Sequence, residues 1–395
     1  MSIGIYISGL GQSTAKETAE KYASRYLKEL EYSTSGFEFY TKIEKIYYLE
    51  ENSSLAIRIL QKPKGQLTAP TDPVLYTFYD FQYSQLLTEK FEQRNLILKN
   101  LFLLILVIRK IPALFRNIFN LNTFIKTKQT FYVFGIFLLM SFAVIWLIPS
   151  VLSLFQNEIS KYFNLDGNLF TTLVSISAIT VPVTAIIILL IPESSTLVTK
   201  LATEFTAVDN YIQYGEQSQT IQGNLDALVE YIVENEPNPT IQFHTYSFGS
   251  IVAMDALFPI GNDVTYNTKE TINLLITVGA PFEFVKGFYP NFYENRNTFM
   301  TEKIQWVNVY SLMDAFASNF RNDNKAGNAH FGIIKNKEKP INLNYEIARK
   351  DTYNPFNFLT LKHIRMHRCY WDETKNGQSC TRLIFNKMKE MGFWK

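Results

Sequence analysis

Two long apolar segments near the middle of the chain constrain its fold more than any other feature. Residues 131–155 and 169–191 contain no charged side chain. A helix needs about 20 apolar residues to cross a bilayer, and Pro182 in the second segment is tolerable in a spanning helix. Buried helices of this length seldom lack a polar face. We therefore predict transmembrane helices over 131–155 and 169–191.

A third apolar stretch precedes them and is of a different kind. Residues 96–108 are interrupted by Lys99 and Asn100, and Arg109 and Lys110 follow. This stretch is too short to span, so we predict an interfacial segment over 96–124. The predicted membrane insertion thus covers residues 96–192. It separates the N-terminal part of one folded domain (1–95) from the C-terminal part (193–395).

The distribution of basic residues predicts an orientation in the membrane. Basic side chains are far more frequent before residue 131 than in the loop 156–168, where Lys161 stands alone. Positive residues favour the cytoplasmic side, so we expect this loop outside and both termini in the cytoplasm. The expected protein is a multi-pass membrane protein with a lipid bilayer as a partner, and its folded domain is cytoplasmic.

Charge and cysteine usage exclude some classes of function. The formal net charge is +2, which predicts no nucleic-acid partner and specifies no oligomeric state. Cys369 and Cys380 lack a metal-ligand spacing. We interpret them as free thiols in a reducing compartment and expect neither a metal nor a cofactor.

Outside the insertion, short β-prone runs alternate with helical patterns. Strands are expected at 3–8, 37–49, 54–60, 74–81, 241–246, 272–278 and 306–310, and helices at 14–30, 221–233 and 248–257. This alternation predicts an α/β fold with a mostly parallel sheet and helices on both faces.

The turn between residues 246 and 249 carries the clearest chemical signal. Ser247 lies between an apolar strand and an apolar helix, Gly249 follows, and Thr245 takes the position of a preceding glycine. The segment resembles the nucleophile elbow G-x-S-x-G of the α/β-hydrolases. The resemblance implies an α/β-hydrolase fold, interrupted by the two-helix insertion, with Ser247 as nucleophile. The alternative is an ordinary strand–helix turn.

Later residues follow the order serine, acid, histidine of this superfamily. Asp314 comes just after the strand at 306–310, where these enzymes keep their acid. His367, with Tyr370 and Trp371 behind it, resembles the late catalytic histidine of lipase-like hydrolases. The resemblance implies Asp314 and His367 as the partners of Ser247. The segment Gly279-Ala280-Pro281 is also similar to lipase-type enzymes.

The other histidines leave alternatives open. His244 is expected to be structural, buried on a strand, while His330 and His363 remain candidates for the base. A zinc site at His363 and His367 would need a glutamate after the first histidine, and Ile364 stands there.

The first strand ends in a glycine-rich turn. Ser8-Gly9-Leu10-Gly11 resembles the H-G-x-G turn of these enzymes, with Ser8 in place of the histidine. The resemblance implies an oxyanion hole built by the turn Gly9, Leu10 and Gly11 together with the Phe248 amide. A nucleotide-phosphate turn is the alternative, but the further glycine of that fingerprint is missing.

Together these features predict a membrane-anchored serine hydrolase that cleaves a carboxylic ester or thioester of a lipid or acylated substrate through an acyl-enzyme. The alternative is a catalytically inactive hydrolase-fold membrane protein acting as an interaction or signalling module. Thr245 and Ser8, both at motif positions, favour that alternative. A transporter is disfavoured, because the two apolar segments contain no charged residue.

Overall fold

A computed structural model describes residues 2–10, 18–119, 194–213, 215–333, 339–346, 363, 366–371 and 379–394, with scattered positions between 135 and 182. The predicted spans at 131–155 and 169–191 lie for the most part outside the described residues, as does the orientation expected from them. Within the described part of the chain, no helix has both the length and the apolar character that crossing a bilayer requires.

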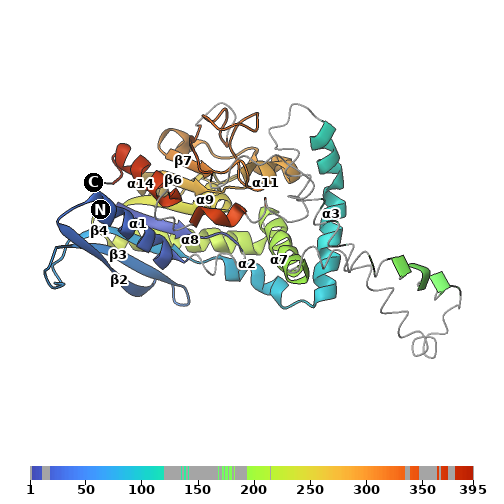
Figure 1. Ribbon diagram of the computed structural model, residues 1–395, viewed down its shortest axis with the longest axis horizontal. Helices are drawn as coiled ribbons and strands as arrows, with labels where there is room; N and C mark the ends of the chain where they lie inside the picture. Colours follow the sequence, from blue (N-terminus) through green and yellow to red (C-terminus); the bar gives the residue numbers. More distant parts are fainter. Residues whose placement is uncertain are drawn as a thin grey trace.

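Eight strands form one mixed sheet in the order β2-β3-β4-β1-β5-β6-β7-β8 (Figure 1). The strands are β1 (Ser2–Ile7), β2 (Phe37–Tyr47), β3 (Ser53–Pro63), β4 (Val74–Phe81), β5 (Thr240–Tyr246), β6 (Ile272–Val278), β7 (Gln305–Tyr310) and β8 (Ile341–Asn344). From β4 to β8 all neighbours are parallel, whereas β2 and β3 are antiparallel additions at one edge. The predicted α/β class and the mostly parallel sheet are confirmed.

Helices cover both faces of the sheet. One face carries α1 (Ala19–Ser33) and α14 (Cys380–Glu390), and the other carries α8 (Glu216–Asn235), α9 (Gly249–Leu257) and α11 (Phe282–Phe288). The remaining helices are α2 (Ser84–Glu92), α3 (Leu96–Phe119), α7 (Ser194–Ile212), α10 (Tyr266–Thr271) and the 3-10 helices η1 (Pro290–Tyr293), η2 (Phe299–Glu302) and η3 (Met366–Trp371).

Strand side chains alternate between two apolar cores. On β1, Ile3, Ile5 and Ile7 point into the core under α8 and α9, while Tyr6 points into the core under α1 and α14. All four are buried. This period of two on a strand buried on both faces accounts for the near-continuous apolar run in the sequence.

α3 differs from the expected short apolar stretch. It continues beyond Arg109 and Lys110 to Phe119, with Pro112 inside it. The helix continues because basic side chains are good helix formers, although proline removes one backbone hydrogen bond. It packs against α7 and α11, at the side of the molecule away from β2 and β3 (Figure 1).

The parallel strands end at one edge of the sheet. β1 lies between β4 and β5, and Ile7 is level with both Phe81 and Thr245. The loops after β1, β4, β5, β6 and β7 therefore meet at this carboxyl edge, where open α/β sheets place their ligand sites.

Candidate active site

Ser247 occupies a sharp turn between β5 and α9. Its φ angle is +52°, in the left-handed region that non-glycine residues rarely adopt. The Ser247 amide donates a hydrogen bond to the Val278 carbonyl oxygen on β6 at 2.8 Å, which fixes the turn to the neighbouring strand. Such strained conformations cluster at functional sites.

Two glycines allow neighbouring backbone segments to approach this turn. A Cβ atom at Gly249 would lie 2.3 Å from the Ile7 carbonyl oxygen and 2.5 Å from that of Ser8. A Cβ atom at Gly9 would lie 2.8 Å from the Ser247 Cβ atom. The start of α9 and the turn after β1 thus pack against each other at Ser247, and only glycine fits at either position.

Thr245 fits the position that the motif gives to glycine. Its buried hydroxyl donates a hydrogen bond to the Ile276 carbonyl oxygen at 2.8 Å and lies 2.9 Å from the Ser250 hydroxyl on α9. The side chain therefore joins β5 to β6 and to α9 without blocking the turn at Ser247.

The structure brings Ser247, His367 and Asp314 into one hydrogen-bonded chain. The Ser247 hydroxyl donates to Nε2 of His367 at 2.7 Å, and Nδ1 of His367 donates to Oδ2 of Asp314 at 2.8 Å. The Asp314 side chain is fully buried, while 12% of the His367 side chain is exposed. An ionised carboxylate only accepts hydrogen bonds, so it holds the imidazole with the proton on Nδ1 and Nε2 turned to the serine.

Tyr370 contacts Asp314, and the sequence did not predict this contact. Its hydroxyl donates to the same Oδ2 atom of Asp314 at 2.8 Å and accepts from the Ser311 amide at 3.0 Å. Burial raises the pKa of Tyr370 well above its ordinary value, so the hydroxyl keeps its proton. The spacing His367-x-x-Tyr370 was the available signal, because a 3-10 helix brings residues three apart to one side.

Glu346, after β8, holds the backbone that carries Asp314. Its carboxylate accepts hydrogen bonds from the Ser311 hydroxyl at 2.8 Å and from the Leu312 amide at 2.5 Å. No motif in the sequence indicated this residue.

Aromatic residues and a glycine enclose the imidazole. The ring of Tyr246 stacks on His367 with centroids 5.4 Å apart, and Phe316 meets it edge-on at 5.2 Å. Gly279 has a φ of +61°, and a Cβ atom there would lie 3.1 Å from Cε1 of His367. The glycine of the Gly279-Ala280-Pro281 segment thus makes room for the imidazole.

The other three histidines lie elsewhere. His363 contacts the loop that carries Asp314. Its Nδ1 atom lies 3.0 Å from the Met313 carbonyl oxygen, and its own carbonyl oxygen accepts a hydrogen bond from the Ala315 amide at 3.1 Å. His330 is exposed, and its Nδ1 atom accepts from the Asn322 amide at 3.2 Å. Among the described residues, no cluster of His, Cys, Asp and Glu could hold a metal ion.

His244 is buried on β5, as expected for a structural residue. Its two ring nitrogens each lie 2.9 Å from a tyrosine hydroxyl, Tyr22 on α1 and Tyr76 on β4. Burial lowers the pKa of His244 to about 3, so the imidazole is neutral. It serves the core between the sheet and α1.

The expected oxyanion turn is only partly within the described chain. Gly9 packs against Ser247, Leu10 is buried beside it, and Gly11 lies outside the described residues. Phe248 directly precedes α9. Its amide belongs to the first turn of that helix, where amides have no partner within the helix and the helix dipole favours negative charge.

A separate cavity lies at the other end of α9. Its volume is about 730 Å³, and its lining includes Asp226, Asp255 and Asp263 but none of Ser247, Asp314 or His367. Burial raises the pKa of Asp226 to about 6. Asp255 forms a buried ion pair with Arg296 at 2.7 Å, which joins α9 to the loop after η1.

The hydrogen-bonded residues Ser247, His367 and Asp314 could together attack a carbonyl group. An imidazole in this position can take the proton of the hydroxyl as the serine attacks a carbonyl carbon. The buried carboxylate stabilises the imidazolium that results, and the imidazole returns the proton to the leaving group. Cys369 and Cys380 are free thiols, as expected, and are not among the hydrogen-bonded residues Ser247, His367 and Asp314.

Comparison with known proteins finds no match among protein-family models, curated proteins or solved structures.

Proposed function

We propose that this protein is a serine hydrolase that cleaves carboxylic esters or thioesters. The observation that carries the proposal is the hydrogen-bonded chain from Asp314 through His367 to Ser247, with Ser247 in a left-handed turn ahead of α9. This arrangement resembles the site of the α/β-hydrolases, with the residues in the chain order that this superfamily uses, and the resemblance supports the proposal. Ser247 attacks the acyl carbon and forms an acyl-enzyme, which water then hydrolyses with His367 as base.

The oxyanion of the tetrahedral intermediate is assigned to the Phe248 amide and the turn Gly9–Gly11. Gly9 supports this assignment, because it is in close contact with Ser247. Each such donor contributes about 10²–10³ to the rate of acyl transfer.

We further propose that the substrate is a lipid or an acylated molecule at a membrane. The chain leaves β4 at the carboxyl edge and returns through α7 and α8 to β5, so residues 96–192 are inserted at the edge that holds Ser247. An aromatic row leads from α7 to the site through Phe205, Phe284, Phe316 and His367, with successive ring centroids 5.7, 5.5 and 5.2 Å apart. An acyl chain fits against such a row better than a small polar ester does.

Labelling of the purified full chain with a fluorophosphonate probe tests the chemistry. We expect one labelled serine in the wild type and none in Ser247→Ala, with strong loss in His367→Ala. His330→Ala is the matched control and should label like the wild type, because His330 is exposed and does not contact Ser247.

The opposite result identifies the alternative function. If folded protein takes no label, the hydrolase-like site is inactive and the chain is better explained as an interaction module. If His367→Ala labels normally while His330→Ala does not, the assignment of the base is wrong.

A further inference from the structure

The outer face of α3 is apolar and exposed. Leu103, Leu106 and Val107 are buried against the domain. The opposite face presents large apolar side chains that are between 37% and 75% exposed: Leu101, Phe102, Ile105, Ile108, Phe115 and Phe119. Leu101, Ile105, Ile108, the exposed Pro112, Phe115 and Phe119 follow one another at intervals of three or four residues, so they form one continuous stripe along the helix. Contiguous apolar surface of this kind marks an interaction site.

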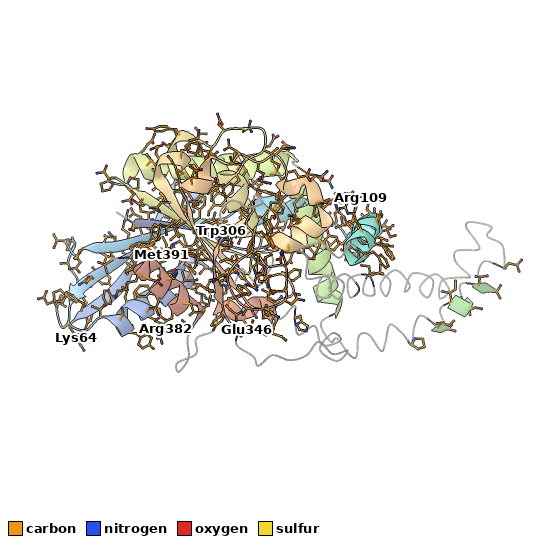
Figure 2. All side chains as sticks on the ribbon, turned by 90° about the horizontal axis from the view of Figure 1, so that it is seen from above. Lys64, Arg109, Trp306, Glu346, Arg382 and Met391 are labelled. Carbon is orange, nitrogen blue, oxygen red and sulfur yellow. The ribbon has the colours of Figure 1, made fainter. Side chains whose placement is uncertain are left out.

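Charges on α3 are all of one sign. Lys99, Arg109, Lys110 and Arg116 are basic, and the helix has no acidic residue. Arg109 and Arg116 are exposed on the same side as the apolar stripe, and Figure 2 shows Arg109 far from Trp306 in the sheet. An apolar face bordered by basic side chains is complementary to an anionic lipid surface.

α3 is held firmly to the rest of the domain. Asp209 of α7 forms ion pairs with Arg109 at 3.2 Å and Lys110 at 3.6 Å, and it accepts a hydrogen bond from the Tyr289 hydroxyl at 2.6 Å. Tyr289 directly follows α11, and the Lys110 ammonium lies 3.5 Å from the centroid of its ring. α3 is therefore joined to α7 and α11, which contribute Phe205 and Phe284 to the aromatic row that leads to His367.

We propose that the exposed face of α3 docks on the surface of an anionic lipid bilayer. Two observations favour lipid over other occupants: the uniformly basic charge, and the uncharged segment 131–155 that follows α3 in the chain. Docking sets the orientation of the whole domain, because the Asp209 cluster joins α3 rigidly to the helices beside the site. The proposal rests on the proposed membrane insertion, but it does not depend on the reactivity of Ser247.

Environment-sensitive fluorescence on the full chain in vesicles tests the proposal. A nitrobenzoxadiazole group is attached at Ile105→Cys in a Cys369→Ser background, with vesicles of phosphatidylcholine and phosphatidylserine. Ile43→Cys is the matched control, because both isoleucines are 47% exposed and Ile43 lies on β2, far from α3 (Figure 1). We expect a blue-shifted emission that lipids brominated near the headgroup quench at position 105 only.

Changing the charge distinguishes an anionic surface from lipid in general. Arg116→Gln should reduce quenching at position 105, and so should vesicles of phosphatidylcholine alone. Fluorophosphonate labelling of Ser247 in detergent should be the same in Arg116→Gln as in the wild type, so a failure of docking and a failure of the hydrolase proposal give different results.

Three outcomes overturn the proposal. Emission at position 105 that equals emission at position 43 shows an open, unoccupied face. A blue shift without quenching that grows with protein density in the vesicles indicates a second copy of the chain. A blue shift without quenching that is independent of density indicates cover by another segment of this chain.

Discussion

At the scale of single residues, Asp314 is the group on which the proposed chemistry depends. Its Oδ2 atom accepts from both His367 and Tyr370, and its Oδ1 atom accepts from the Phe316 amide at 2.9 Å. These three hydrogen bonds fix the orientation of the buried carboxylate. Tyr370 therefore acts as a positioning residue for the acid.

Tyr370→Phe tests this role. Removing the Tyr370 hydroxyl leaves the Asp314 carboxylate with one donor fewer, so the carboxylate stabilises a protonated His367 more strongly. As the pH is lowered, Ser247 should therefore lose its base sooner than in the wild type. We expect the pH profile of fluorophosphonate labelling to move to higher pH. Labelling rates across a pH series measure this shift.

Tyr40→Phe is the matched control for that measurement. Its hydroxyl also donates to a carboxylate, Asp72, at 2.7 Å, but on β2 far from Ser247. The pH profile of Tyr40→Phe should match the wild type. An unchanged profile in Tyr370→Phe would show that the tyrosine is only a packing residue.

Asp80, near the end of β4, should make stability depend on pH. Burial raises the pKa of Asp80 to about 6, although the hydrogen bond from Gln82 acts in the opposite direction. Between pH 4 and 6 the folded state keeps a proton that the unfolded chain releases, so the free energy of unfolding falls as pH rises through this range. In the wild type, the Asp80 carboxyl should lower the free energy of unfolding by about 2–3 kcal/mol between pH 4 and pH 7. Asp80→Asn should abolish this decrease, as measured by urea unfolding at the two pH values.

Asp323→Asn provides a comparison of opposite sign. The Arg321 guanidinium lowers the pKa of Asp323 to about 2, so its contribution is present above pH 4 and is lost as pH falls toward 2. If Asp80→Asn keeps the wild-type slope between pH 4 and 6, Asp80 is not the source of the effect.

At the scale of elements, the site depends on how closely α9 approaches β1. The Ile7 and Ser8 carbonyl oxygens occupy the space that a side chain at position 249 would need. Backbone atoms cannot rotate away as a flexible side chain can, so α9 itself must move to accommodate a methyl group there.

Gly249→Ala should therefore lower both stability and reactivity. We expect a loss of about 1–3 kcal/mol in the free energy of unfolding, typical of overpacking. The labelling rate of Ser247 should also fall, because a shift of α9 displaces the turn. Urea unfolding and fluorophosphonate kinetics measure the two effects.

Gly223→Ala on α8 is the matched control. No atom lies within 4 Å of the Cβ position there, so alanine should stabilise the helix by about 0.4–1 kcal/mol and leave labelling unchanged. Equal effects of the two substitutions would contradict the packing argument.

At the scale of the whole molecule, the predicted insertion at residues 96–192 and the candidate site share one edge of the sheet. An anchor at either terminus would have left the domain undisturbed. An insertion between β4 and β5 instead places α3 and α7 beside the aromatic row that leads to His367. This placement supports the proposal that the substrate enters from a membrane.

Cysteine accessibility in intact cells tests the predicted topology. Asn157→Cys should react with an impermeant thiol reagent added outside, because the loop 156–168 is expected to be external. Gln219→Cys, at an exposed position of α8, should be protected until the cells are permeabilised. The reverse pattern would overturn the orientation and the cytoplasmic assignment together.

Local features of the fold could be predicted from the sequence. The strand at 74–81 has the predicted limits, as does the one at 272–278, and Ser247 lies in the predicted turn. Strand runs, turns and helical periodicity depend on residues close together in the chain, so their pattern is visible without a structure. The short β8 strand and the support from Glu346 were not predicted, because they depend on distant partners.

Which histidine contacts Ser247 could be decided only from the tertiary structure. His330, His363 and His367 all follow Ser247 in the chain, and a motif resemblance alone favoured the last of them. The 366–371 helix packs against Tyr246 and Gly279, and this packing turns His367 toward Ser247, which precedes it by 120 residues. His363 instead contacts the loop that carries Asp314. Local sequence sets which residues are available for a site, whereas contacts between distant segments decide which of them meet, because packing depends on the shape of the whole core.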